Sequence, residues 1–186
     1  MKHFLLLAGL AGSLASARAQ APAPEQSTRG PVLSVGIYGP SANVGVQVEQ
    51  PLGRHFSLGA FGSRQFSSDF RGYQGALAGR YYFRPTAPTG LYLQATVGIY
   101  NTHALVQTFY PGATNRSELH VQGSGGGLGL GYQWRFAQHL TATIGLGVKA
   151  YPTNLGTCDC GYTKDWYATG QPGSVLDGQL SIGYAL

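Results

Sequence analysis

Apolar and polar residues alternate with a period of two along most of the chain from Val32 onward. The clearest example is segment 140–151, where the apolar positions are Leu140, Ala142, Ile144, Leu146, Val148 and Ala150. Small or polar residues stand between them. Strict alternation over about ten residues indicates a β-strand with one face in an apolar medium and the other in a polar or tightly packed one. The pattern therefore predicts an all-β chain.

The same pattern predicts eight strands. They cover residues 32–39, 43–50, 56–66, 72–83, 91–101, 119–136, 140–151 and 174–186. The sixth is rich in glycine from Gly123 to Gly131, which leaves open whether its first half is strand or loop. The glycine spacing there resembles a nucleotide-binding loop, but no helical pattern follows, so a nucleotide site is not predicted.

The predicted connections differ in length at the two ends of the strands. Segments 51–55, 84–90 and 137–139 are short turns, and on the other side 102–118 and 152–173 are long, with 40–42 and 67–71 short. Short turns at one end and longer loops at the other are typical of an outer-membrane barrel. Because only closure pairs every backbone group in a membrane, we predict an eight-stranded antiparallel up-and-down transmembrane β-barrel. The alternative is a soluble secreted barrel or sandwich.

The first 19 residues are predicted to be a cleaved signal peptide. A basic start is followed by an apolar stretch from Phe4 to Ala15, and Ala17-Arg18-Ala19 provides the small residues of a cleavage site. Residues 20–30 are then a flexible lead-in, and residues 31–186 are the barrel.

The composition narrows the class further. Charged residues make up only 10% of the chain and 29 of its 186 residues are glycine, whereas a typical soluble domain carries about 25% charged residues. This argues against a soluble enzyme. The net charge of +5 comes from scattered basic residues, so nucleic-acid binding is not predicted. No cofactor is predicted.

A few charged residues fall inside the predicted strands, mostly on the inward side. They are Glu49, Arg80, Arg135, Lys149 and Asp177. Buried charges need partners, so we expect Lys149 to pair with Asp177, and Glu49 with Arg80 or Arg135, in a plugged lumen. The alternative is a gated pore. Arg64 falls on the outward side, where it is expected to extend to the membrane surface or to bind lipopolysaccharide phosphate.

Aromatic residues gather near the strand ends, as at membrane interfaces. Near the predicted periplasmic end are Phe56, Tyr81, Phe83, Trp134, Phe136 and Tyr184, and near the outer end are Phe66, Tyr100, Phe109, Tyr110 and Tyr151. Ordinary core aromatics are the alternative.

Cys158 and Cys160 are the two cysteines, and their predicted place is a long external loop. In an oxidising compartment this pair favours a local disulfide. A metal site or free or intermolecular thiols are the alternatives, and no other metal site is predicted.

Residues suited to catalysis are sparse. His55 and Ser57 have the side chains of a nucleophilic pair, but the predicted topology places them at the periplasmic turn. His103, His120, Ser117 and Glu118 fall in or beside one outer loop. Solvated loop residues are the simpler interpretation, and no catalytic residue is predicted.

Residues 31–186 resemble the small eight-stranded outer-membrane β-barrel proteins of Gram-negative bacteria, the OmpA/OmpX-like class. The matching features are the Ala17-Arg18-Ala19 signal, the GRYYF run at 79–83 before a proline-containing turn, and the final alternating strand. The resemblance implies insertion by the barrel-assembly machinery, which recognises a terminal aromatic residue in that class. This chain departs from the pattern because it ends in Leu186, with Tyr184 two residues earlier.

These observations favour a non-enzymatic integral outer-membrane protein with a structural or surface-interaction role through its external loops. Candidate contacts in loops 102–118 and 152–173 are Phe109, Tyr110, Tyr162, Trp166 and Tyr167, because aromatic residues are enriched at binding surfaces. The expected partners are outer-membrane lipid, lipopolysaccharide and the assembly machinery, with the external ligand undefined. The alternatives are a lipid A-modifying barrel enzyme and a soluble secreted lipocalin-like binder of an apolar ligand.

Overall fold

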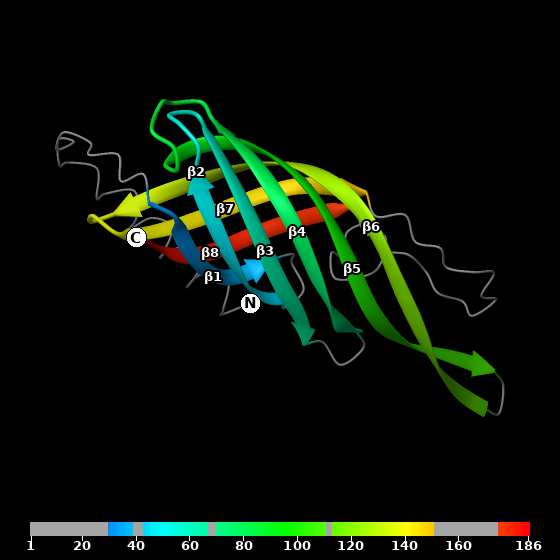
Figure 1. The fold of residues 1–186 in the computed structure, drawn as a ribbon. Coiled ribbons are helices and arrows are strands. Elements are labelled where there is room, and N and C mark those ends of the chain that lie inside the picture. Colours follow the sequence, from blue (N-terminus) through cyan, green and yellow to red (C-terminus); the bar gives the residue numbers. More distant parts are fainter. Residues whose placement is uncertain (1–29, 39–42, 67–69, 111–112, 151–174) are drawn as a thin grey trace, which may run out of the picture.

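The computed structural model describes residues 30–38, 43–66, 70–110, 113–150 and 175–186. Within them, eight antiparallel strands close into a barrel in which each strand pairs with its sequence neighbours and β8 pairs with β1 (Figure 1). The strands are β1 Val32–Tyr38, β2 Asn43–Pro51, β3 Phe56–Phe66, β4 Phe70–Tyr82, β5 Gly90–Tyr110, β6 Ala113–Phe136, β7 Leu140–Ala150 and β8 Leu176–Ala185. The predicted eight-stranded antiparallel barrel is therefore confirmed. No helix among these residues is long and apolar enough to cross a membrane.

One end of the barrel, which we call the short-turn end, carries the turns 52–55, 83–89 and 137–139. The start and the end of the described chain meet there, since the backbone N–H of Leu186 donates to the carbonyl of Pro31 over 3.0 Å. The turn between β4 and β5 folds inward, with Ala87 and Pro88 buried, and Ala87 N–H donates to the Arg54 carbonyl over 2.9 Å. This turn therefore helps to close the short-turn end.

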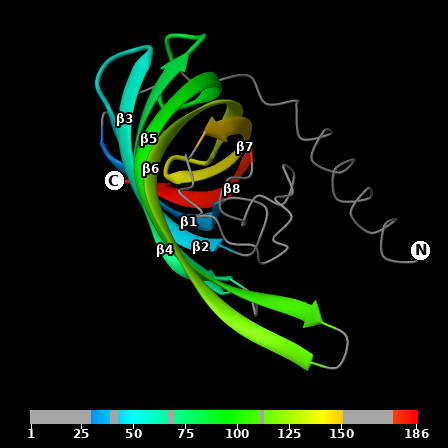
Figure 2. The same ribbon diagram turned by 90° about the vertical axis from the view of Figure 1, so that its right-hand side faces the viewer.

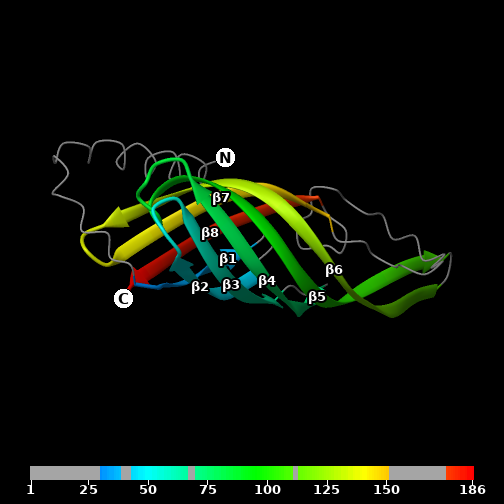
Figure 3. The ribbon, with the colours of Figure 1, turned by 45° about the horizontal axis from the view of Figure 1, so that its top comes forward.

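At the opposite end, β5 and β6 continue well beyond their neighbours as a two-stranded hairpin (Figures 1 and 3). The pairing runs on without interruption to Tyr110↔Ala113, whereas β4 begins only at Phe70, opposite Ala104. The prediction of a loop over 102–118 is therefore wrong. The alternation of apolar residues fades in this segment, but valine, threonine and aromatic residues suit a strand, and the two arms pair with each other.

The outer wall of the barrel is apolar. Outward side chains in the middle of the strands are well exposed, among them Val46 (58%), Val97 (61%) and Leu146 (74%). Figure 2 shows β3, β4, β5 and β6 following one another around one side of this wall. The inward positions between them are mostly small or polar, with several aromatic residues. A lipocalin-like barrel would have its apolar face inside, so the described strands contradict that alternative.

Glycine on the inward side of β6 makes room for lumen side chains. A Cβ atom at Gly131 would lie 2.3 Å from the Tyr92 ring, closer than any real contact. The sequence left open whether part of the Gly123–Gly131 segment is strand or loop, and the structure shows a strand, because β6 is continuous through it. The glycines let the sheet pass close to the large side chains that fill a narrow lumen.

A belt of aromatic side chains surrounds the short-turn end. Tyr81 lies 5.1 Å from Phe56 and 5.8 Å from Phe83 between ring centroids, and Tyr132 lies 4.7 Å from Trp134. The six residues predicted for this end are all exposed to between 39% and 57%. The expectation for the other end fails at Tyr100, which is 9% exposed because it lies in the inward phase of β5. The side chains of Phe66, Phe109, Tyr110 and Tyr151 lie outside the described residues.

Candidate functional site

Arg80 occupies the centre of the lumen, where it is 3% exposed, and uses all five of its N–H donors. Nε donates to Gln94 Oε1 (2.7 Å), Nη1 donates to Glu49 Oε2 (2.6 Å) and Gln133 Oε1 (3.2 Å), and Nη2 donates to Gln179 Oε1 (2.9 Å) and Gln47 Oε1 (3.3 Å). A guanidinium group has no further donor. The charge is therefore fully hydrogen-bonded by side chains from β2, β5, β6 and β8.

Glu49, on β2, compensates the charge of Arg80. The side chains of both residues are 2% exposed, and Oε2 of Glu49 makes the 2.6 Å ion pair. Its other oxygen, Oε1, accepts hydrogen bonds from the Tyr82 hydroxyl (2.7 Å) and from the Ser57 hydroxyl. Both carboxylate oxygens are thus used, which is what a buried ion pair requires. We call Arg80, Glu49 and their hydrogen-bonding partners the lumen network.

Aromatic rings fill the lumen on both sides of this network. The Tyr92 ring lies 4.5 Å from the Arg80 guanidinium carbon and packs against Tyr82, with ring centroids 5.4 Å apart. Toward the hairpin end, Tyr38 stacks on Phe61 at 5.2 Å. A cavity of about 20 Å³ beside Gln94, Thr96 and Gln179 is large enough for a water molecule, which needs roughly 10–15 Å³. Among the described residues, side chains thus fill the lumen around the lumen network.

The four glutamines of the lumen network were not singled out from the sequence. Gln47, Gln94, Gln133 and Gln179 all occupy inward positions of their strands, and this phase is readable from the alternation. Their meeting at one level depends on the stagger of eight strands around the barrel. The sequence therefore shows that several strands carry an inward glutamine. It does not show the strand register that brings these glutamines together.

Lys149 and Asp177 lie together on β7 and β8, toward the hairpin end. Lys149 Nζ is 3.8 Å from Asp177 Oδ1, and the side chains are 10% and 27% exposed. The N–O distance of this ion pair is longer than that of Arg80 and Glu49, and its side chains are more exposed to solvent. A partly exposed pair of this kind contributes at most about 1 kcal/mol, so it is a minor part of the barrel's stability.

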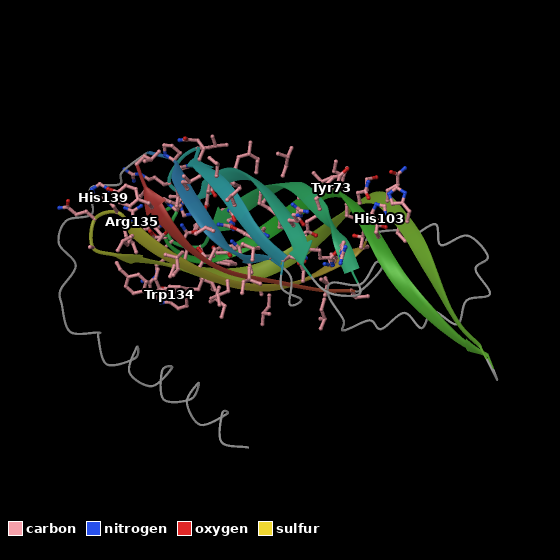
Figure 4. All side chains as sticks on the ribbon, turned by 90° about the horizontal axis from the view of Figure 1, so that it is seen from below. Tyr73, His103, Trp134, Arg135 and His139 are labelled. Carbon is pink, nitrogen blue, oxygen red and sulfur yellow. The ribbon has the colours of Figure 1, made fainter. Side chains whose placement is uncertain are left out.

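Arg135 is separated from the lumen network. Glu49 takes Arg80 as its ion-pair partner, and the expected alternative of Arg135 is not realised. Figure 4 shows Arg135 near His139 at the far end of the barrel from His103. Arg135 lies two residues beyond Gln133 on β6, nearer the short-turn end, which places it past the level of Glu49.

His55 and Ser57 do not form a nucleophilic pair. His55 Nδ1 donates to the Tyr82 carbonyl over 2.8 Å, and Ser57 Oγ donates to Glu49. The His55 ring stacks on Tyr81 with centroids 5.6 Å apart. His139 makes the same kind of contacts. Its Nδ1 donates to the Ala185 carbonyl over 2.9 Å, and its ring stacks on Tyr184. Both histidines therefore fasten turns to strand ends.

His103 and His120 are directly opposite each other on β5 and β6 and face outward. Their rings stack with centroids 4.4 Å apart. His120 Nε2 donates to Asn101 Oδ1 over 2.8 Å. Ser117 and Glu118 belong to β6, but their side chains lie outside the described residues.

Several predicted site residues fall where the structure makes no statement. Cys158, Cys160, Tyr162, Trp166 and Tyr167, together with the predicted signal peptide, lie outside the described residues. Phe109 and Tyr110 are in β5, with undescribed side chains. Among the residues that are described, no group of three or more His, Cys, Asp and Glu side chains is placed to hold a metal ion.

A closed eight-stranded barrel with an apolar wall and large side chains in the lumen has the same architecture as the small barrels of the OmpA/OmpX type. Residues 15–170 match the model of a family described as "Protein of unknown function (DUF3575)". The chain belongs to this family. No curated protein matches the sequence.

Solved structures of three bacterial proteins are similar in fold to the chain. The N-terminal β-barrel domain of Pseudomonas aeruginosa OprF is 14% identical with a TM-score of 0.45, over 85% of this chain and 98% of that one. Neisserial surface protein A is 14% identical with a TM-score of 0.46, over 83% and 92% of the two chains. The Yersinia pestis outer membrane protein Ail is 11% identical with a TM-score of 0.44, over 84% and 99%. At these identities the likeness concerns the fold alone.

Proposed function

We propose that the chain is an integral outer-membrane protein with a non-conducting lumen, and that it acts as an anchor holding the β5–β6 hairpin outside the membrane. The observation that carries this proposal is the inverted arrangement of the barrel. Leucine, valine and isoleucine face outward, while Arg80 and Glu49 are sealed inside. In water such a wall would be an exposed apolar surface much larger than soluble monomers tolerate. In a bilayer it is the lipid-facing side.

The strand lengths agree with this membrane placement. A tilted transmembrane strand needs about 9–11 residues, and β2, β3, β7 and β8 have 9 to 11 residues. β5 and β6 have 21 and 24 residues. The excess is the hairpin, so we assign it to the aqueous side, where it is available for contact with other molecules.

A structural and surface-interaction role fits the described residues better than lipid A modification. The serine and histidine that suggested nucleophilic chemistry, Ser57 and His55, hydrogen-bond to Glu49 and to the Tyr82 carbonyl instead. The outer histidines, His103 and His120, stack on each other. We therefore propose a non-enzymatic role.

The membrane orientation can be tested with an epitope tag inserted between Pro111 and Gly112. We expect antibody to label this tag on intact cells, because the hairpin points outward. A tag inserted after Gln138, in the turn between β6 and β7, is the control and is expected to be labelled only after the outer membrane is permeabilised. The reverse result, or labelling of neither tag after permeabilisation and confirmed expression, contradicts the proposal.

The sealed lumen predicts that the purified full-length protein forms no ion channels. After reconstitution into planar bilayers, we expect no stepwise current above that of bilayers without protein, because the lumen network and the Tyr82–Tyr92 pair block the path. Insertion is verified on the same preparation by the heat-dependent gel shift of folded barrels. Regular, long-lived conductance steps from inserted protein would refute the non-conducting lumen.

A further inference from the structure

The outer wall changes from apolar to cationic near the hairpin end of β3 to β6. Arg64 on β3 is opposite Tyr73 on β4, which is opposite Asn101 on β5. Two residues further along, Arg71 on β4 is opposite His103, which is opposite His120 on β6. We call Arg64, Arg71, His103 and His120 the rim cluster. All four are exposed and face outward.

The rim cluster is compact. Directly opposite residues of antiparallel strands have Cβ atoms about 4.5–5.5 Å apart, and two residues along a strand span about 6.8 Å. The two histidine rings are 4.4 Å apart and nearly parallel, at 16°. Asn101 joins the two levels, since its Oδ1 accepts from His120 (2.8 Å) and its Nδ2 donates to the Tyr73 hydroxyl (3.3 Å). Several cationic and N–H donor groups thus share one small patch.

The rim cluster lies directly beyond the apolar part of the wall. The row immediately below contains Val46 and Ile99, which are 58% and 61% exposed. Tyr73, 60% exposed, stands at the change from apolar to polar, where interfacial tyrosines are enriched. A barrel that buries its apolar wall in a bilayer therefore holds the rim cluster at the depth of the lipid headgroups.

We propose that the rim cluster binds the phosphate groups of a phosphorylated lipid in the outer leaflet. The proposal rests on the membrane placement given above. Guanidinium groups bind phosphate with paired hydrogen bonds, and Arg64 and Arg71 are brought to neighbouring positions by the register of β3 and β4. None of the outward positions of β3 to β6 whose side chains are described carries a carboxylate. The patch is therefore complementary in charge to a phosphorylated headgroup.

The test measures lipid binding to the purified full-length protein in a non-ionic detergent, with lipid A that carries two phosphates as the probe. Each surface arginine contributes about fivefold to binding of an anionic lipid, so the Arg64→Gln/Arg71→Gln variant is expected to bind about 25-fold more weakly. The matched control is Arg54→Gln/Arg84→Gln, which removes two exposed arginines from the short-turn end. We expect the control to bind like the unchanged protein.

Two further measurements separate the possible outcomes. Enzymatically dephosphorylated lipid A is expected to bind the unchanged protein as weakly as lipid A binds the double variant, and inorganic phosphate is expected not to compete at millimolar concentration. Equal binding of both lipids, or equal losses in the variant and the control, overturns the proposal. Strong competition by inorganic phosphate would indicate a site for soluble phosphate and also overturn it. The heat-dependent gel shift reports membrane-type folding separately, so failure of the barrel to insert counts against the proposed function instead.

Discussion

Replacing Arg80 by methionine is expected to lower the free energy of unfolding of the reconstituted barrel by about 3–5 kcal/mol, the cost of breaking a buried ion pair from one side. Methionine keeps much of the volume but leaves the Glu49 carboxylate buried without its cation, and it deprives four glutamine side chains of a donor. Unfolding by urea in lipid vesicles, followed by the gel shift, measures the change.

Two variants accompany this measurement. Arg84→Met removes an exposed arginine at the short-turn end and is expected to change the free energy by no more than about 0.5 kcal/mol. Glu49→Leu combined with Arg80→Met removes both charges, so it is expected to be less destabilising than Arg80→Met alone. If Arg80→Met behaves like Arg84→Met, the lumen network does not stabilise the barrel.

Replacing Leu146 by arginine is expected to cost about 2–4 kcal/mol, the penalty for a cation near the middle of the lipid-facing side of a barrel. Leu146 is 74% exposed and lies in the middle of β7. On a water-facing wall the same substitution would be almost without effect. Equilibrium unfolding in vesicles therefore distinguishes lipid from water outside the barrel.

Leu52 provides the matched position for this experiment. It is 66% exposed, but it lies in the turn between β2 and β3, outside the strands. Leu52→Arg is expected to change the free energy of unfolding by no more than about 0.5 kcal/mol. Equal effects of Leu52→Arg and Leu146→Arg would mean that the wall around Leu146 is not in lipid, and the membrane placement would have to be abandoned.

The alternation of residues was sufficient to predict the strand count, the antiparallel order and the side of the wall that carries Leu146. It was sufficient because the outer wall and the lumen impose opposite demands on successive residues. Beyond Thr102 the opposite demands of the two faces end. The alternation of apolar and polar residues therefore fades there, although β5 and β6 continue. The hairpin was missed for this reason. Strand pairing joins residues 105–110 to residues 113–118, and strand pairing by itself leaves little trace in the pattern of hydrophobicity.

The site was predictable in its chemistry but not in its connections. Glu49, Arg80, Lys149 and Asp177 fall at inward positions of the alternation. They were therefore predicted to form buried ion pairs, because charged residues are rare inside these strands. The choice between Arg80 and Arg135 as the partner of Glu49 depends on the level at which each side chain enters the lumen. That level is set jointly by the registers of β2 to β6, and a single strand contains no record of it.

The lumen network also bears on how the barrel assembles. Gln179 Nε2 donates to Gln47 Oε1 over 2.8 Å, although the two residues are 132 positions apart in the chain. All the N–H donors of Arg80 are used only when acceptors from both β2 and β8 are in place. A half-built sheet therefore carries an incompletely bonded cation, and the last strand gains its full stabilisation only when it reaches β1. Closing the barrel therefore completes the hydrogen bonds of Arg80 in one cooperative step. Assembly intermediates in which the sheet is still open are disfavoured.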